Sequence, residues 1–282
     1  MAVKFLGQFL MERGVITPPQ LLAAIQAQRA SNPLLGELAV RQGLLSAAQA
    51  RRINERQRVE DRRFGDIAQE MGLLDAGQLE SLLAAQKAGR KLFGQVLVEQ
   101  GVIDAQRLEA ELAAHRAGQD AAQHALAVGV ADHALAEFAE GTIALCGRLF
   151  PRMLDSQCQA AGLLGPGELD AYPHVAHVRV EGERSLSIGL ACDLETMRAL
   201  TCALLKIGPE RCDNALALDG LGEVVNVLMG YAVRNVLPDE VSYHAFPPDN
   251  SVSAAQLAAD RDRSLALLMN SQLGAFVLLV GA

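Results

Sequence analysis

The run DGLGEVVNVLMG, in the C-terminal third of the chain, carries two carboxylates and an amide at helical spacing, followed one turn later by a glycine. On an α-helix Asp219, Glu223, Asn226 and Gly230 fall within about 60° of one another and form one stripe. An amide such as Asn226 offers an acceptor and two donors at fixed geometry, which suits it to orient a water molecule for hydrolysis. The alternative is an ordinary solvated surface pair. Because a glycine in an exposed helix costs about 1 kcal/mol relative to alanine, Gly230, with Gly222 beside the stripe, predicts close approach by another backbone.

The stripe requires a long helix with a wide apolar face, and the apolar residues around it predict that helix over Asn214–Val236. Short apolar runs separated by turn residues predict strands elsewhere in the second half. The predicted strands are Val175–Val180, Leu186–Cys192, Val241–Phe246, Ser264–Asn270 and Ala275–Val280, with a turn at 181–183 and a loop at 162–167. Further helices are predicted over Asp132–Met153 and Leu194–Lys206. This order predicts an α+β fold with a mainly antiparallel sheet covered by helices on one side.

The pattern D-x3-E-x2-N-x3-G, followed by Pro247-Pro248, resembles the signature helix of the CheC/CheX/FliY chemotaxis phosphatases. The resemblance runs from about Asp132 to Ala282. CheC-type proteins carry a second motif on their first helix, where this chain has Glu137 and Glu140 but no following asparagine. The resemblance therefore implies a single-motif, CheX-like domain that dephosphorylates the phospho-aspartate of a CheY-like response regulator.

The same resemblance implies roles for the stripe. The receiver brings its own Mg²⁺ and lysine, so no cofactor is expected from this chain, and what is missing is an oriented water. Asn226 would position that water, and Glu223 would pair with the receiver's lysine; these two are the expected catalytic residues. Asp219 and Gly230 would support them. The rival from another class is a non-catalytic adaptor that binds the receiver without turnover.

The first half contains four repeats of 29 residues, marked by two sets of glycines at 7, 36, 65, 94 and 14, 43, 72, 101. A polar residue ends each unit with the same step: Gln28, Gln57, Gln86 and His115. Thr17, Ser46, Asp75 and Asp104 stand where helix N-caps are needed, and the second glycines suit the position just after a helix. The repeats therefore predict helical hairpins, about eight helices in all.

The units LGQFLMERGVITPPQLLAAIQAQ and FGQVLVEQGVIDAQRLEAELAAH resemble the MshEN or GspE N-terminal domain of secretion and pilus ATPases. In that family an RLG…G…Q motif binds cyclic di-GMP, which implies a site around Arg63, Gly65, Gln57 and Gln86. Only Arg63 keeps the arginine before Leu/Phe-Gly. If the repeats bind cyclic di-GMP, a rival function is that of a cyclic di-GMP-binding signalling protein with the C-terminal domain as output. The alternative for the repeats is a protein-interaction or dimerising module. The expected domains are 1–118 for the repeats, 119–130 for a linker and 131–282 for the CheX-like part.

Charge is unevenly distributed over the 282 residues. Residues 116–282 hold 11 Lys/Arg against 20 Asp/Glu, which argues against a nucleic-acid partner. The arginine run over 51–63 is interrupted by Glu55, Glu60 and Asp61, and predicts a solvated helix face with i,i+4 ion pairs. The six histidines have no spacing that gives three ligands, so no metal site is expected. The five cysteines predict mostly buried, reduced thiols.

Assembly and location complete the expectations. The apolar strand Ala275–Val280 is predicted as a sheet edge, and an unpaired apolar edge, together with the CheX resemblance, predicts a homodimer through the C-terminal domain. No stretch of the sequence is expected to span a bilayer, and the N-terminus lacks the pattern of a signal peptide. The chain is therefore expected to be cytoplasmic, without membrane insertion.

Overall fold

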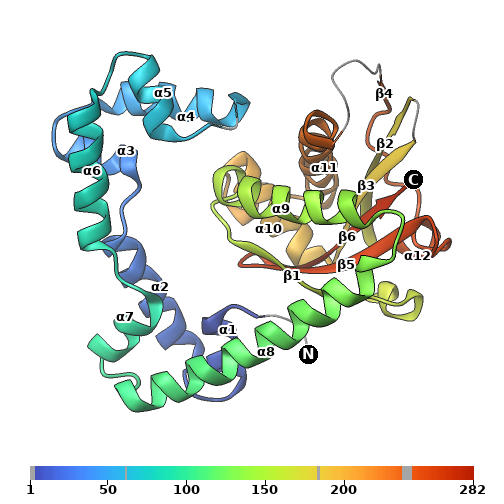
Figure 1. The fold of residues 1–282 in the computed structure, drawn as a ribbon, viewed down its shortest axis with the longest axis horizontal. Coiled ribbons are helices and arrows are strands. Elements are labelled where there is room, and N and C mark those ends of the chain that lie inside the picture. Colours follow the sequence, from blue (N-terminus) through green and yellow to red (C-terminus); the bar gives the residue numbers. More distant parts are fainter. Residues whose placement is uncertain (1–3, 61, 183–184, 237–242) are drawn as a thin grey trace. The chain divides into compact units, whose positions relative to one another are not determined.

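The computed structural model describes residues 4–60, 62–182, 185–236 and 243–282. Contacts divide the chain into two compact units: Leu6–His115, and Arg116–Ala282 together with the start of the chain (Figure 1). Each unit has its own buried apolar core.

Short and long helices alternate through the first unit. They are α1 (Leu6–Glu12), α2 (Pro18–Ser31), α3 (Leu35–Arg41), α4 (Ala47–Glu60), α5 (Phe64–Glu70), α6 (Ala76–Gly89), α7 (Phe93–Glu99) and the first part of α8 (Ala105–Ala131). Gly14, Gly43, Gly72 and Gly101 follow the short helices and all have positive φ, between 66° and 71°. Only glycine adopts this conformation readily, which is why each short helix ends there. The other glycine set lies inside the short helices, where a Cβ on Gly65 would collide with Leu79 and one on Gly94 with Leu108.

The four helical hairpins pair in an order that does not follow the sequence. The first (α1–α2) shares a core with the fourth (α7–α8), and the second (α3–α4) shares another with the third (α5–α6). The periodic glutamines hold these pairs together through their side-chain amides. Each donates to the backbone carbonyl of an equivalent position: Gln28 to Lys91 (3.3 Å), Gln57 to Arg62 (3.0 Å) and Gln86 to Pro33 (3.0 Å).

Residues 119–130, the predicted linker, are helical. Helix α8 continues without a break from Ala105 to Ala131, and Val130 near its end is buried in the core of the second unit. The following helix α9 (Ala136–Met153) begins later than the predicted Asp132. His133 fixes this start, because its Nδ1 accepts from the Leu135 backbone at 3.0 Å while its Nε2 lies 2.7 Å from the Arg261 carbonyl oxygen.

One antiparallel sheet of six strands forms the second unit, in the order β1-β5-β6-β3-β2-β4. The strands are β1 (Cys158–Leu163), β2 (His174–Glu181), β3 (Leu186–Cys192), β4 (His244–Ala245), β5 (Ser264–Ser271) and β6 (Gly274–Gly281). The predicted antiparallel pairing of β2 with β3 is confirmed; Glu183 of its predicted turn lies outside the described residues. So do residues 241–242 of the predicted strand Val241–Phe246, of which the structure shows β4.

Two predictions for the sheet were wrong, one of a loop and one of an edge strand. The predicted loop at 162–167 overlaps the end of β1, which pairs with β5 as far as Leu163. The predicted edge strand Ala275–Val280 lies in β6, which is central and hydrogen-bonded on both sides, to β3 and to β5. Its apolar composition reflects burial on both faces, so the edge that favoured a homodimer does not exist at that strand.

Helices α9, α10 (Leu194–Leu205) and α11 (Asn214–Val236) pack on one face of this sheet, in the larger apolar core (Figure 1). A smaller core on the other face includes Leu169 of the 3-10 helix η1 (Pro166–Ala171) and Ala254 of α12 (Ala254–Leu257). A second 3-10 helix, η2 (Pro209–Arg211), lies between α10 and α11. The sheet is thus covered by helical segments on both faces, more than the single covered side that was predicted.

The second unit consists of two halves with the same topology. The first half is α9, β1, β2 and β3, and the second is α11, β4, β5 and β6. Exchanging the strands of one half for those of the other turns the strand order into its own reverse, as a pseudo-twofold arrangement requires. The buried faces of α9 and α11 also match in register. Phe138, Thr142, Leu145, Cys146, Leu149 and Phe150 align with Ala217, Leu221, Val224, Val225, Leu228 and Met229, all of them buried.

Candidate functional site

Helix α11 presents the predicted polar stripe. Asp219, Glu223, Asn226 and Gly230 are all exposed, whereas the residues that separate them are buried or half-buried. The helix begins after Asp213, whose carboxylate accepts from the Leu216 backbone at 2.9 Å and caps its first turn. The structure therefore brings all four predicted residues onto one surface.

The apolar face of α11 packs in the core, against α9, α10, β2 and β3. Its segment Asn214–Arg234 is long and apolar enough to cross a membrane by length and composition, contrary to the expectation from the sequence; half of it is buried inside the unit. Burial on both sides of a narrow exposed stripe gives the helix a fixed orientation. The core packing of the helix therefore sets the direction in which the stripe residues face.

Two glycines permit this packing. A Cβ on Gly220 would lie 2.8 Å from Cβ of Thr201 on α10, and Thr201 Oγ1 donates to the Ala217 carbonyl at 2.8 Å. Thr201 was missed in the sequence; the glycine inside a helix was the signal that something approaches closely. A Cβ on Gly222 would lie 3.2 Å from Pro248 Cβ. The close contact with Pro248 therefore accounts for a glycine at position 222.

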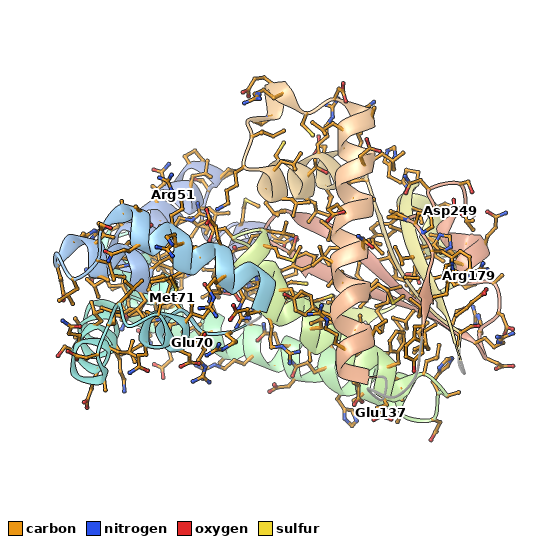
Figure 2. All side chains as sticks on the ribbon, turned by 90° about the horizontal axis from the view of Figure 1, so that it is seen from above. Arg51, Glu70, Met71, Glu137, Arg179 and Asp249 are labelled. Atoms are coloured by element: carbon orange, nitrogen blue, oxygen red, sulfur yellow. The ribbon has the colours of Figure 1, made fainter. Side chains whose placement is uncertain are left out.

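Pro248 is held beside the stripe by an arc of chain anchored to β2. Phe246 donates its backbone N–H to the Arg179 carbonyl at 2.9 Å, and Asp249 exchanges backbone hydrogen bonds of 2.8 and 3.0 Å with His177. The Arg179 guanidinium lies 4.5 Å from the centre of the Phe246 ring. Figure 2 shows Arg179 and Asp249 near each other. Pro247 and Pro248 lie between these two anchored residues, and Pro248 packs against the motif helix at Gly222.

Glu223 and Asn226 are available for an external partner. Among the described residues neither side chain has a hydrogen bond or an ion pair, and the two lie three positions apart on the same exposed face. An exposed carboxylate can pair with a cation on a partner, and an exposed amide can both donate to and accept from one water molecule. Because no described residue bonds either side chain, docking would break no bond within the described part of the chain.

The corresponding helix α9 lacks these groups. With the buried faces in register, Glu140, Ala144 and Gly147 occupy the positions of Asp219, Glu223 and Asn226. Two of the three functional positions are therefore small and apolar. Glu137, labelled in Figure 2, is exposed one turn before Glu140 but aligns with no stripe residue. The described residues thus carry this constellation on one of the two corresponding helices.

The four residues of the predicted nucleotide site have different surroundings. The side-chain amide of Gln57 donates a hydrogen bond to the Arg62 carbonyl, next to Arg63. The side-chain amide of Gln86 donates to the carbonyl of Pro33, shortly before α3. Gly65 is buried against Leu79. Arg63 is exposed as the N-cap residue of α5. Three of the four thus have a packing role, and Arg63 remains as an exposed cation.

The arginine-rich segment forms the predicted i,i+4 pair and adds a second carboxylate. Arg56 Nε contacts Glu60 at 2.6 Å and Arg56 Nη2 contacts Glu70 at 2.8 Å, while Arg62 bonds both glutamates. Glu70 is labelled in Figure 2. Hydrogen bonds from Arg56 hold the pKa of Glu60 and of Glu70 below the usual glutamate value. The network joins α4 to α5 and so belongs to the packing of the second and third repeats.

No group of three or more His, Cys, Asp or Glu side chains in the described part of the chain could hold a metal ion. All five cysteines are free thiols, and Cys146, Cys192 and Cys212 are buried. Burial raises the pKa of the Cys146 and Cys192 thiols to about 12, so both stay protonated and unreactive at neutral pH.

Comparison with known proteins gives likenesses in structure only. No protein-family model and no curated protein matches the chain. Similar solved structures include CheX, CheC-like and FliY chemotaxis proteins, each matching about half of it. CheX from Desulfovibrio desulfuricans has 16% identity and a TM-score of 0.39, and covers 51% of this chain and 97% of its own.

Two further solved structures are similar to the same extent. CheX from Vibrio vulnificus has 16% identity and a TM-score of 0.41, over 53% of this chain and 99% of its own. The third is a complex of CheX with CheY, BeF3 and Mg²⁺ from Borrelia burgdorferi. It has 14% identity and a TM-score of 0.41, and covers 51% of this chain and 96% of the matched chain.

Proposed function

We propose that the second unit is a phosphatase that removes phosphate from the phospho-aspartate of a CheY-like response regulator. One observation carries the proposal: a helix otherwise fixed in the core exposes Asp219, Glu223, Asn226 and Gly230 on one stripe. A carboxylate and an amide on a helix held by the core, with no hydrogen bond or ion pair to the described part of the chain, can enter the site of another protein and act there.

This chain has to contribute only part of the catalytic machinery. An acyl phosphate is already reactive, and a receiver supplies Mg²⁺ and a lysine that hold the phosphoryl oxygens. Asn226 accepts from and donates to one water molecule, so that the water lies in line with the bond to the leaving aspartate carboxylate. Glu223 pairs with the receiver's lysine and sets the docking angle, and Asp219 adds a second negative charge one turn earlier.

The rival reading is a receiver-binding adaptor without turnover. The adaptor needs the docking carboxylates but has no use for Asn226 as a water ligand. The deciding experiment is release of phosphate from a panel of phosphorylated CheY-like receivers of the same genome, with the full chain at catalytic concentration. Turnover supports the phosphatase, whereas stoichiometric binding without release supports the adaptor.

For the repeats we propose an interaction module that localises or regulates the phosphatase. What supports this choice over cyclic di-GMP binding is the use of Gln28, Gln57 and Gln86 to hold backbone carbonyls. Calorimetry of the full chain with cyclic di-GMP tests it, and saturable heat at micromolar ligand would favour nucleotide binding as the main function. A cytoplasmic location belongs to the same proposal, since phosphorylated receivers are the substrate.

A further inference from the structure

The motif helix α11 contains three glycines: Gly220, Gly222 and Gly230. Each weakens the helix relative to alanine, because glycine has more backbone freedom to lose. One physical reason for a glycine in a helix interior is a neighbour that leaves no room for a Cβ.

Two of the three have that reason inside the chain. Gly220 is buried beneath Thr201, whose Cβ would be 2.8 Å from a Cβ at position 220. Gly222 is buried against Pro248 at 3.2 Å. Both distances are shorter than ordinary van der Waals contact, so alanine at either position would push its neighbour away.

Gly230 has no such neighbour among the described residues. It is exposed, and a Cβ built there meets nothing within 4 Å. It also lies on the stripe, four residues beyond Asn226, which is about 6 Å along the helix axis. An atom that touches Gly230 therefore lies at the rim of any site centred on the Asn226 amide.

We propose that Gly230 is a docking contact for the receiver: the receiver backbone bordering its phosphorylated aspartate packs directly on the bare helix backbone at Gly230. This rests on the proposed phosphatase function and adds a residue that sets the approach distance. A side chain at position 230 would clash with the receiver backbone and weaken the docked complex, so that less receiver is bound at a given concentration. Gly230 does not touch the reacting atoms, so its effect is on association.

The test uses the full chain with Gly230→Ala and Gly230→Leu. The matched control is Gly147→Ala on α9, because Gly147 is also exposed in a helix interior with nothing within 4 Å of a Cβ, but lies off the stripe. Affinity is measured for a CheY-like receiver loaded with beryllofluoride and Mg²⁺, turnover is measured by phosphate release, and stability by thermal unfolding.

Both alanine variants are expected to unfold at a higher temperature than wild type. Gly230→Ala is expected to weaken receiver binding about tenfold and Gly230→Leu more, with KM raised and kcat at saturating receiver near wild type. Gly147→Ala is expected to bind and turn over as wild type does. A more stable protein that binds its substrate less well cannot be explained by misfolding.

Two outcomes overturn the inference, and they are distinguishable. If wild type dephosphorylates a receiver and Gly230→Leu binds it with unchanged affinity, the docking contact is wrong while the phosphatase stands. If wild type neither binds nor dephosphorylates any receiver of the panel, the proposed function is wrong and the docking contact is wrong with it.

Discussion

Pro248 packs against Gly222, so that a Cβ at position 222 would be only 3.2 Å from Pro248 Cβ. The two residues are far apart in the sequence, yet their contact fixes the arc between β4 and α12 against the motif helix. Gly222 immediately precedes Glu223, whose side chain emerges beside this arc. The contact therefore gives one side of the exposed stripe a rigid border.

Asn226→Ala is expected to lower kcat for receiver dephosphorylation by about a hundredfold or more, because it removes the group that orients the water. Binding of a receiver loaded with beryllofluoride should stay within about threefold of wild type, since a water ligand contributes little docking energy. Phosphate release and titration calorimetry measure the two effects. Wild-type turnover in this variant would show that α11 is not the active surface.

Glu223→Ala is expected to damage both binding and turnover. Charge-assisted hydrogen bonds at a desolvated contact are worth roughly 1.5–3 kcal/mol, so the Kd should rise about ten- to a hundredfold. Glu140→Ala on the corresponding helix α9 is the matched control, because Glu140 is also an exposed helical carboxylate but lacks a following amide. Equal effects of the two substitutions would mean that a general negative charge, and not this position, attracts the receiver.

Gly220→Ala is expected to destabilise the protein by about 1–3 kcal/mol, because the added Cβ collides with Thr201. Chemical unfolding measures this change. Combining it with Thr201→Ala should recover part of the lost stability, since the two sites are in contact and cannot be additive. Strict additivity in the double variant would contradict close packing of α10 on α11.

Gln57→Ala is expected to destabilise the repeat unit by about 1–3 kcal/mol, since it leaves the half-buried Arg62 carbonyl without its amide donor. Gln86→Ala should do the same through Pro33. Gln69→Ala is the control, being exposed and without a hydrogen bond from its side chain among the described residues. Thermal unfolding of the full chain would detect the difference, and no loss in either variant would contradict the packing role of these amides.

Stability of the repeat unit should fall in acid through Glu60 and Glu70. Arginine hydrogen bonds lower both folded-state pKa values below the usual value of 4.5, so the contribution is present above that value and is lost as pH falls below it. Because the network is exposed, the effect should be small and should weaken at high salt. The difference in unfolding midpoint between wild type and Glu70→Gln, followed from pH 7 to pH 3, measures it. A difference that grows toward pH 3 would contradict the sign.

The sequence alone was sufficient for features set by local periodicity. Helical spacing placed Asp219, Glu223, Asn226 and Gly230 on one stripe, and the structure exposes all four, because the pitch of a helix does not depend on its neighbours. The bounds of the long helix, Asn214–Val236, were predicted correctly. The glycine at position 14 and its equivalents marked the helix ends, since positive φ is a property of the residue itself.

Tertiary structure decided what depends on which segments meet. Four similar repeats offer similar surfaces, so their periodicity could not reveal that Gln28 bonds Lys91 while Gln57 bonds Arg62. An apolar strand such as β6 has the same composition at an edge as in the centre, and its central place follows only from pairing with both β3 and β5. The reasons for Gly220 and Gly222 lay in Thr201 and Pro248, which only the packed structure brings within reach. Local conformation follows from steric effects between neighbouring residues, which can be read from the sequence. Contacts between distant segments depend instead on the packing of the whole chain.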